Sequence, residues 1–301
     1  MPQWDAEVIV DESQARDLIA AHFPHVDTSD LTLIGEGWDN TVWGTRDGIA
    51  FRFPRREIAV PGVEREIAIL PMLAPRLPVA IPDAAYAARP SEAFGWPWFG
   101  SRMIDGQELA STSLGDSARI ALGRRLGELL RTLHELRLPE AVALPVDPFH
   151  RTDMTVRVPM TRTAVGALTA VWTAPPLVDE LLAAAEVLPP TTVRTLVHGD
   201  LHARHVLVDR DGTGTLTGVI DWGDVCRADP SADLSLLWSA LPPAGREQFL
   251  AGYGPVAHDT LLRARVLALF LCATLASYAR DTGQIVLERE MLDGLQRTLT
   301  G

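Results

Sequence analysis

The sequence predicts an α+β fold of two lobes, a small antiparallel β-rich lobe over residues 1–104 and a mainly helical lobe over residues 105–301. Two patterns indicate this division. Short β-branched and aromatic runs, broken by glycine turns, fill much of the first hundred residues. Beyond them, longer segments repeat apolar residues at helical spacing. A chain of 301 residues is long enough for two such lobes with real hydrophobic cores.

The expected N-terminal lobe begins with a helix. Asp11 with Gln14 resembles a capping box, and helical spacing follows it. The stretch "LTLIGEGWDNTVWGTRDGIAFRFPR" at 31–55 predicts three antiparallel strands, because glycine-containing turns interrupt its apolar runs. A second helix is expected over "VEREIAILPML" at 63–73, followed by an extended aromatic segment, "WPWFGSRMIDG", at 96–106.

The expected C-terminal lobe is helical apart from one small hairpin. "SARIALGRRLGELLRTLHEL" at 117–136 has the spacing of a long amphipathic helix, with Ile120, Leu126, Leu130, Leu133 and Leu136 near one side. Helices are also expected across the alanine-rich residues 151–190 and throughout the chain after Ser231. Between them, "HVLVD" and "LTGVIDW", separated by the turn "RDGTG", predict two paired strands within 205–222.

Composition and charge narrow the class of protein. Hydrophobic residues make up 47% of the chain and charged residues 22%, as in an ordinary globular protein. The net charge of −12 disfavours a nucleic-acid or anionic-membrane partner, since both attract clusters of cationic side chains. Cys226 and Cys272 are the two cysteines and have no zinc-site spacing, which argues against a zinc site or a disulfide scaffold.

The sequence predicts neither a signal peptide nor a membrane-spanning helix. The N-terminal stretch lacks the basic and apolar regions of a signal peptide. The longest uncharged apolar run, Val266–Ala279, is too short to span a bilayer and predicts a buried helix. We therefore expect a cytoplasmic protein without a membrane partner.

Two aspartates flank the predicted hairpin. Asp200 precedes its first strand and Asp221 ends its second, so a hairpin brings both carboxylates to one site. Neighbouring carboxylates can orient a nucleophilic hydroxyl and can hold Mg²⁺, which prefers oxygen ligands. His205 lies five positions after Asp200, where the protein-kinase arrangement of these groups has an amide ligand.

An ordered set of motifs gives these residues a family context. "GEGWDN" at 35–40 and "FRFPR" at 51–55 precede "HGDL" at 198–201 and "GVIDWGD" at 218–224. Each motif alone recurs by chance, but the set, in this order and at these spacings, resembles the aminoglycoside phosphotransferase family over roughly residues 30–240. That family comprises antibiotic kinases, macrolide phosphotransferases among them, with a protein-kinase-like fold.

The resemblance implies roles for the residues around the hairpin. Asp200 corresponds to the catalytic aspartate that accepts or orients the proton of the substrate hydroxyl, and Asp221 to the aspartate that holds the metal bridging the nucleotide phosphates. Asp233 is expected to brace the catalytic loop by hydrogen bonding. His198 is expected to be structural.

The resemblance also implies a nucleotide site in the N-terminal lobe. Arg52 lies where the family usually has a phosphate-binding lysine, and Glu66 matches the glutamate that steadies that cation. Arginine is always charged and can fork onto phosphate and carboxylate together. Backbone amides of a covering loop would approach the phosphates, and main-chain groups of a hinge would hold the purine edge. The loop residues are Gly35, Glu36, Gly37 and Asn40, and the hinge residues run from Ser101 to Met103.

His205 departs from the family's usual amide, and three interpretations stay open. It binds a second metal through a water, it ligates a softer divalent ion directly, or it instead only hydrogen-bonds Asp200 and fixes the loop. His202 and Arg204, in the same loop, could reach phosphate or substrate, but exposure to solvent is the simpler expectation. Asp224 lines the substrate mouth or is a solvated loop acid, and both interpretations stay open.

The function that the resemblance implies is a small-molecule kinase. It would use Mg²⁺ and transfer the γ-phosphoryl group of ATP or GTP to a hydroxyl of an antibiotic of the aminoglycoside or macrolide type. Acidic residues late in the chain suit an amine-bearing acceptor, although a solvated C-terminal face explains them equally well; they are Asp281, Glu288, Glu290 and Asp293. Two alternatives remain: a metabolic kinase for an amino alcohol or sugar, and a catalytically silent nucleotide-binding protein, which only Arg52 and His205 support. Nothing in the sequence indicates an oligomeric state.

Overall fold

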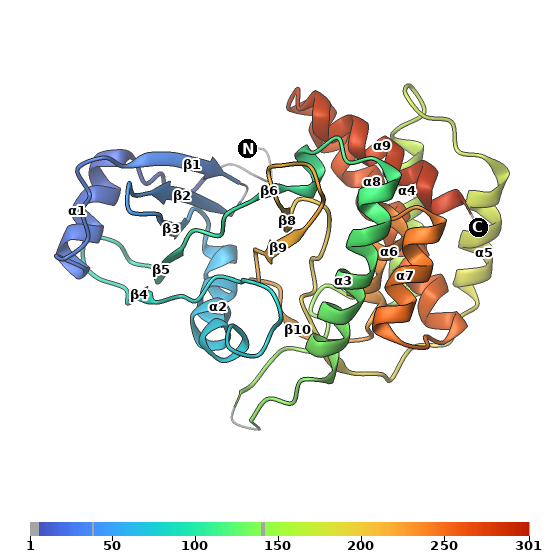
Figure 1. Ribbon diagram of the computed structural model, residues 1–301, viewed down its shortest axis with the longest axis horizontal. Helices are drawn as coiled ribbons and strands as arrows, with labels where there is room; N and C mark the ends of the chain where they lie inside the picture. Colours follow the sequence, from blue (N-terminus) through green and yellow to red (C-terminus); the bar gives the residue numbers. More distant parts are fainter. Residues whose placement is uncertain (1–5, 38, 140–141, 301) are drawn as a thin grey trace. The chain divides into compact units, whose positions relative to one another are not determined.

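The computed structural model describes residues 6–37, 39–139 and 142–300. The chain divides into two compact units, with the boundary between Ile104 and Asp105. The first unit, blue to cyan in Figure 1, contains an antiparallel sheet and two α-helices, and the second is mainly helical. The expected α+β fold class, with a β-rich first unit and a mainly helical second unit, is confirmed.

The first unit is built on a five-stranded antiparallel sheet with the order β1-β2-β3-β5-β4. The three strands expected within 31–55 are confirmed as neighbours, and the segment at 96–106 adds a fourth beside them. In the third strand Phe51 and Phe53 are fully buried and Arg52 is only partly buried, as the two-residue period of a strand requires. The strands are β1 Thr32–Glu36, β2 Asn40–Gly44, β3 Ile49–Pro54, β4 Tyr86–Ala88 and β5 Trp98–Arg102.

Helices and aromatic rings complete the first unit. Helix α1 (Glu12–His22) begins where expected, because the Asp11 side chain accepts a hydrogen bond from the Gln14 amide at 2.8 Å. A short 3-10 turn, η1 (Glu57–Ala59), leads into α2 (Val60–Leu73). The ring of Trp98 packs 4.7 Å from that of Phe53, centroid to centroid, in a buried aromatic core.

The second unit contains two small sheets that carry its polar loops. The predicted hairpin is confirmed: Val206 pairs with Val219, Leu207 with Gly218 and Val208 with Leu216. A short strand joins it to make a three-stranded sheet with the order β6-β8-β9, and β7 pairs with β10 in a separate sheet. The strands are β6 Gln107–Glu108, β7 Thr195–Val197, β8 Val206–Val208, β9 Leu216–Val219 and β10 Cys226–Ala228.

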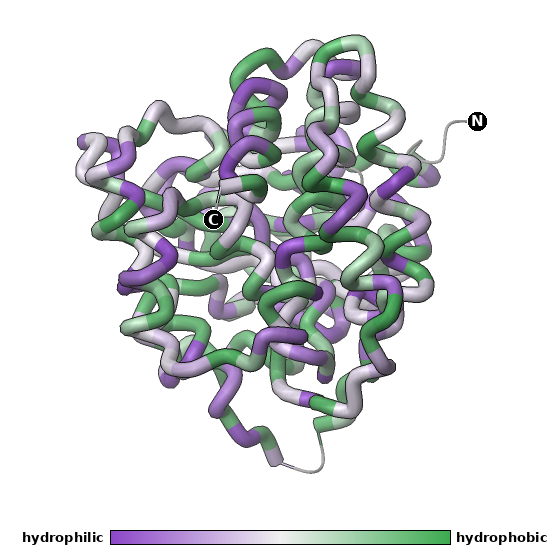
Figure 2. Tube along the Cα trace, turned by 90° about the vertical axis from the view of Figure 1, so that its right-hand side faces the viewer, coloured by the Kyte–Doolittle hydropathy of each residue, from purple (hydrophilic) through white to green (hydrophobic). Residues whose placement is uncertain are grey.

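Helices make up the rest of the second unit. The longest, α8, packs against α4, α6 and α9, while α3 packs along α7. Polar and apolar residues alternate along the helical traces in Figure 2, as expected for helices with one buried side. The helices are η2 Leu109–Ser111, α3 Asp116–Glu135, α4 Met154–Gly166, α5 Pro176–Glu186, α6 Ser231–Ala240, α7 Pro243–Tyr253, α8 His258–Asp281 and α9 Ile285–Leu299.

The buried side of α3 differs from the expected one at its first turns. Leu126, Leu130 and Leu133 are buried as expected, but Ile120 is only partly buried, and the neighbouring Arg119 is buried instead. The reason is a partner from the end of the chain, because Arg119 Nη2 lies 2.9 Å from Glu290 Oε2. Apolar spacing alone does not identify a position that is reserved for a buried ion pair.

Helix α8 includes the apolar run 266–279. Among the described residues it is the one helix long and apolar enough to cross a membrane, with a mean hydropathy of 1.6 over its most apolar window. It is longer than the run itself, at 24 residues, and 56% of that window is buried inside the protein. Burial on this scale is typical of a core helix, which is the role expected for this segment.

The α3–α7 contact generates a test of the fold. A Cβ atom at Gly127 would lie 2.2 Å from the Phe249 carbonyl oxygen, so Gly127→Ala requires the helices to separate. We expect it to lower the free energy of unfolding by about 1 to 3 kcal/mol, measured by urea denaturation. Gly166→Ala is the matched control, since a Cβ atom there meets nothing within 4 Å. Equal stabilities for the two variants would contradict this packing.

Candidate active site

A sharp turn between β7 and β8 sets the course of the candidate catalytic loop, residues 198–205. Gly199 has a φ of +90°, a conformation that glycine adopts at little cost. A Cβ atom at this position would lie 2.4 Å from the carbonyl oxygen of Asp224. Glycine in "HGDL" is therefore required by both the turn and the close approach of the neighbouring loop, and Asp200 follows it directly.

The side chain of Asp233, in the first turn of α6, binds the backbone of this loop. Its Oδ2 accepts a hydrogen bond from the His198 amide at 2.8 Å, and its Oδ1 accepts one from the Gly199 amide at 2.9 Å. Burial opposes the charged form of Asp233, but hydrogen bonds led by the one from His134 hold its pKa below the usual value. The expected bracing role of Asp233 is confirmed.

His134 extends this network to a third helix. Its Nε2 lies 3.0 Å from Asp233 Oδ2, and its Nδ1 lies 2.8 Å from the hydroxyl oxygen of Tyr253. A neutral imidazole satisfies both contacts by donating from Nε2 and accepting at Nδ1. Residues of α3, α6 and α7 therefore fix the loop together. The sequence predicted no partner for His134.

His198 connects the two segments that carry the aspartates. The buried ring accepts a hydrogen bond from the Asp200 amide at Nδ1 (3.3 Å) and donates one from Nε2 to the Ile220 carbonyl (3.0 Å). Burial lowers its pKa, so the imidazole is neutral as this pair of contacts requires. The structural role expected for His198 is confirmed by these contacts.

Asp221 follows Ile220 in a strained conformation. Its φ of +65° lies in the left-handed region, which is uncommon outside glycine but which aspartate tolerates better than most residues. Backbone strain of this kind clusters at functional sites. The carboxylate thereby comes within 3.5 Å of His205, measured from Asp221 Oδ2 to Nε2.

The hydrogen bonds of His205 fix the tautomer of its ring. Nδ1 lies 2.7 Å from the carbonyl oxygen of Asp200, which can only accept, so Nδ1 carries the proton. In the neutral ring, Nε2 then presents its lone pair on the side of Asp221. His205 thus fixes the loop through the backbone of Asp200. This contact is compatible with either of the two metal-binding interpretations as well as with a loop-fixing role alone.

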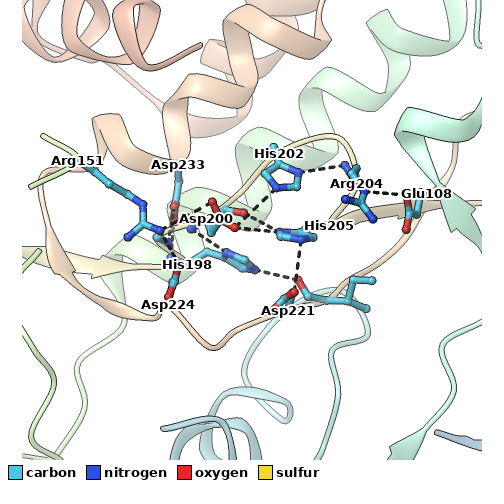
Figure 3. A network of polar contacts seen from close by, with 12 residues as sticks. Glu108, Arg151, His198, Asp200, His202, Arg204, His205, Asp221, Asp224 and Asp233 are labelled. Atoms are coloured by element: carbon cyan, nitrogen blue, oxygen red, sulfur yellow. Dashed lines mark hydrogen bonds and ion pairs between the residues drawn. The ribbon is translucent and has the colours of Figure 1, made fainter. Parts of the chain in front are cut away.

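The carboxylate of Asp200 lies between two sets of neighbours, as Figure 3 shows. On one side, Oδ2 is 3.7 Å from His202 Nε2 and 3.8 Å from His205 Nδ1. On the other, Oδ1 is 3.9 Å from Arg151 Nη2. These separations exceed hydrogen-bonding distance, so the carboxylate oxygens keep lone pairs for an incoming hydroxyl.

The same neighbours set the charge of Asp200. Burial alone would raise its pKa, but His202, His205 and Arg151 together outweigh burial and lower it. The ligand atoms of Asp200, His202 and His205 lie within 4.8 Å of one another, a grouping that could also hold a metal ion.

The expectation that His202 and Arg204 are exposed was wrong for His202. That ring is 7% exposed and stacks on His205, with the centroids 3.9 Å apart. Burial lowers its pKa to about 3, so it is uncharged at neutral pH. The tight turn from His202 to His205, closed by a backbone hydrogen bond of 2.9 Å, folds the ring inward, and polarity alone does not predict such a turn.

The neighbouring loops supply an ion pair that the sequence did not predict. Asp224, for which a place at the substrate mouth and a solvated loop were both open, pairs with Arg151, which the sequence did not single out. Arg151 comes from the loop before α4, far from any recognised motif. Only the folded chain brings it to Asp200.

In the first unit, the predicted phosphate-binding pair is formed. Arg52 Nη1 lies 3.1 Å from Glu66 Oε1, and Glu66 is fully buried in α2. When the Asn40 amide is oriented with its oxygen toward Arg52, that oxygen accepts hydrogen bonds from Nε at 3.0 Å and Nη2 at 2.7 Å. Asn40 therefore helps to orient the guanidinium through its side chain.

The rest of the expected covering loop links β1 and β2. The Gly37 amide donates to the Asn40 carbonyl at 2.9 Å, and the Glu36 carboxylate lies 2.9 Å from Arg55 Nη2. A Cβ atom at Gly35 would meet nothing within 4 Å, so that segment is open to a ligand.

Ser101 and Met103, two of the expected hinge residues, already form hydrogen bonds within the first unit. The buried hydroxyl of Ser101 accepts from the Ala84 amide at 2.9 Å. Met103 is 47% exposed, but its amide donates to the Gly48 carbonyl at 2.8 Å. That amide can serve a purine base only if this bond breaks, a constraint that β-strand patterning did not reveal.

A comparison with known protein families assigns the chain. The sequence model described as "Phosphotransferase enzyme family" matches residues 30–267. The chain belongs to this family. The resemblance found in the sequence is confirmed over most of its length, including the segments that carry Arg52, Asp200 and Asp221.

Curated relatives match this chain over shorter stretches. It is 33% identical over 115 residues to a viomycin phosphotransferase of Streptomyces vinaceus, covering 38% of this chain and 39% of the relative. It is 35% identical over 153 residues to an aminoglycoside 3′-phosphotransferase of Streptomyces fradiae, covering 45% and 53%. The matched segments thus span about half or less of these relatives' length.

Solved structures match the chain over nearly its whole length. The GDP and kanamycin complex of APH(2″)-IIIa superposes with a TM-score of 0.69 at 25% identity, covering 95% of this chain and 99% of the other. The macrolide 2′-phosphotransferase MphH of Brachybacterium faecium gives 0.62 at 23% identity, covering 95% and 97%. These likenesses confirm the expected kinase-like fold.

The network around Asp233 yields a stability prediction. In Asp233→Asn one amide oxygen replaces two acceptors, so one of the two loop N–H groups faces an amide donor. We expect the free energy of unfolding to fall by about 2 to 4 kcal/mol, measured by chemical denaturation. Asp179→Asn, on the exposed side of α5, should change it by less than about 0.5 kcal/mol. Similar losses in both variants would show that the Asp233 contacts contribute little.

Proposed function

We propose that this protein is a kinase that transfers the γ-phosphoryl group of a nucleoside triphosphate to a hydroxyl of a small-molecule antibiotic. The observation that carries the proposal is the placement of Asp200 and Asp221 at the two outer ends of one hairpin, joined through His198 and His205. Membership of the phosphotransferase family supports it.

Asp200 is the proposed catalytic residue. Its lowered pKa keeps the carboxylate ionised at neutral pH, and its oxygens lie beyond hydrogen-bonding distance of their ion-pair partners. An acceptor hydroxyl would donate to it and attack the γ-phosphorus atom. The new oxygen–phosphorus bond forms as the bond to the nucleoside diphosphate breaks, and the hydroxyl proton passes to Asp200.

Asp221 and His205 are the proposed holders of Mg²⁺. A carboxylate oxygen and an imidazole with an unprotonated Nε2 fit such an ion, with the imidazole acting through a bound water because Mg²⁺ prefers oxygen. When bound, Mg²⁺ neutralises charge on the nucleotide phosphates. The left-handed backbone of Asp221 fixes where its carboxylate is presented.

The first unit would bind the nucleotide. Arg52, held by Glu66 and Asn40, would contact phosphate oxygens with its guanidinium charge, and the loop from Gly35 to Asn40 would cover them. Main-chain groups of 101–103 would hold the base. We propose ATP or GTP as the donor, which places the reaction in the cytoplasm.

The acceptor class is proposed from charge and from the relatives. Proteins similar to this one are named for viomycin and aminoglycosides, and one was solved with kanamycin. The net charge of −12 suits a cationic antibiotic. We propose an acceptor of the aminoglycoside or macrolide type, bound by the helical second unit.

The proposal is tested by direct mass detection of product. The purified protein is incubated with Mg²⁺ and either ATP or GTP against a panel of aminoglycosides, viomycin, macrolides and small amino alcohols. We expect one antibiotic to gain a single phosphoryl group. Phosphorylation of an amino alcohol alone would replace the antibiotic by a metabolic acceptor, and no product with any acceptor would contradict the proposed function.

The role of Asp200 leads to a kinetic prediction. Asp200→Asn removes the proton acceptor while keeping the shape, so kcat should fall at least about 100-fold. Nucleotide affinity, measured by calorimetry, should stay unchanged. Asp116→Asn, exposed at the start of α3, is the control and should keep full activity. Turnover at the wild-type rate in Asp200→Asn would remove that residue from its assigned role.

The role of Arg52 leads to a binding prediction. Arg52→Met removes a cation from the phosphate site, and we expect the Kd for nucleotide to rise about tenfold, which corresponds to about 1.4 kcal/mol. Arg52→Lys restores the residue usual in the family and should recover most of the affinity. Arg46→Met, in the exposed turn between β2 and β3, should bind as the wild type does. An unchanged Kd in Arg52→Met would place the phosphates elsewhere.

A further inference from the structure

Beside the proposed catalytic loop lies a guanidinium that no motif accounts for. Arg151 precedes α4, and its Nη2 lies 3.9 Å from Asp200 Oδ1 while it also forms an ion pair with Asp224. Figure 3 shows Arg151 and Asp224 on the side of Asp200 opposite His202 and His205. The question is whether this contact is incidental or part of how the site works.

The loop that carries Arg151 is built to a defined shape. Residues 145–147 bond to β10: the Arg227 amide donates to the Pro145 carbonyl at 2.9 Å, and the Asp147 amide donates to the Arg227 carbonyl at 3.1 Å. The Asp147 carboxylate then accepts from the Arg151 amide at one oxygen and from the Thr152 amide and hydroxyl at the other, each at 2.8 Å. The backbone of Arg151 is thus held directly.

The side chain of Arg151 is held as firmly as its backbone. It is 16% exposed, and its guanidinium carbon lies 4.6 Å from the centre of the Phe149 ring. Burial would lower its pKa, but Asp224 and Asp200 outweigh burial and raise it, so the charge is permanent. Nη1 is buried with no hydrogen-bond partner among the described residues, which leaves donor capacity beyond the Asp224 pair.

The other neighbours of Asp200 do not anchor its carboxylate from the opposite side. His202 faces Oδ2, and its Nε2 lies 3.7 Å from that oxygen, beyond hydrogen-bonding distance. His205 donates its Nδ1 proton to the Asp200 carbonyl rather than to the carboxylate. Among the described residues, Arg151 is the one arginine within 4 Å of the Asp200 carboxylate.

We propose that Arg151 is a positioning residue for the transfer reaction: anchored by Asp224, it holds the Asp200 carboxylate in the orientation that receives the acceptor proton. The role rests on the proposed kinase function. Arg151 attracts Oδ1, which leaves Oδ2 turned toward His202 and His205 and fixes the plane of the carboxylate. Without it, that group is free to rotate about its side-chain bond, and the acceptor hydroxyl loses a preorganised partner.

The test compares substitutions at Arg151 in the full-length protein with its best antibiotic acceptor. We expect Arg151→Met to lower kcat about 10- to 100-fold, the usual effect of removing a group that orients a reacting side chain, with both KM values unchanged. Arg151→Lys keeps the positive charge, so its loss of kcat should be at most about the square root of the loss in Arg151→Met, for example about 10-fold where Arg151→Met loses about 100-fold. Arg162→Met is the matched control, because Arg162 forms an exposed ion pair with Glu186 and should keep wild-type kinetics.

Each other outcome overturns the proposal in a distinguishable way. A wild-type kcat in folded Arg151→Met would make the contact incidental. A higher KM for the acceptor with unchanged kcat would make Arg151 an acceptor contact. If Arg151→Met fails to fold, Arg151→Lys provides the test. Lysine lacks the forked guanidinium of arginine, so kcat should fall several-fold while both KM values stay unchanged. An unchanged kcat would refute the positioning role. Absence of product from the wild-type protein would refute the kinase function and this role together.

Discussion

The arrangement of the second unit depends on one buried carboxylate. Asp233 binds the amides of His198 and Gly199, and these two residues set the direction in which Asp200 leaves the turn. A buried charge is costly unless hydrogen bonds compensate for its lost hydration, and here His134 and the two amides donate to both oxygens of the carboxylate. The loop therefore has one stable position relative to α6, and every contact of Asp200 follows from it.

Three histidines then connect the segments that carry Asp200 and Asp221. His198 ties the backbone of Asp200 to that of Ile220, His205 ties the Asp200 carbonyl to the side of Asp221, and His202 closes the stack. In each ring the observed contacts define which nitrogen carries the proton. The three rings hold the backbone of the site, while the Arg151 guanidinium places a positive charge on the opposite side of Asp200.

The sequence predicted local elements and the ends of the hairpin well, because glycine turns, strand alternation and motif order are local signals. It placed Asp200 and Asp221 at neighbouring loop ends and paired Arg52 with Glu66, as the structure does. It missed the burial of Arg119 and His202, the Arg151–Asp224 pair and the bonded amide of Met103. Each of these depends on a partner distant in sequence or on a turn whose geometry polarity does not encode.

The Arg52–Glu66 pair has a consequence for chemical probes of this protein. The sequence contains no lysine, so the proposed phosphate-binding position carries a guanidinium where the family usually has a nucleophilic amine. A guanidinium stays protonated and resists acylation at neutral pH. Nucleotide probes that label kinases by transferring an acyl group to the phosphate-site lysine would therefore leave this protein unmarked, and activity-based profiling by that route would overlook it in any sample that contains it.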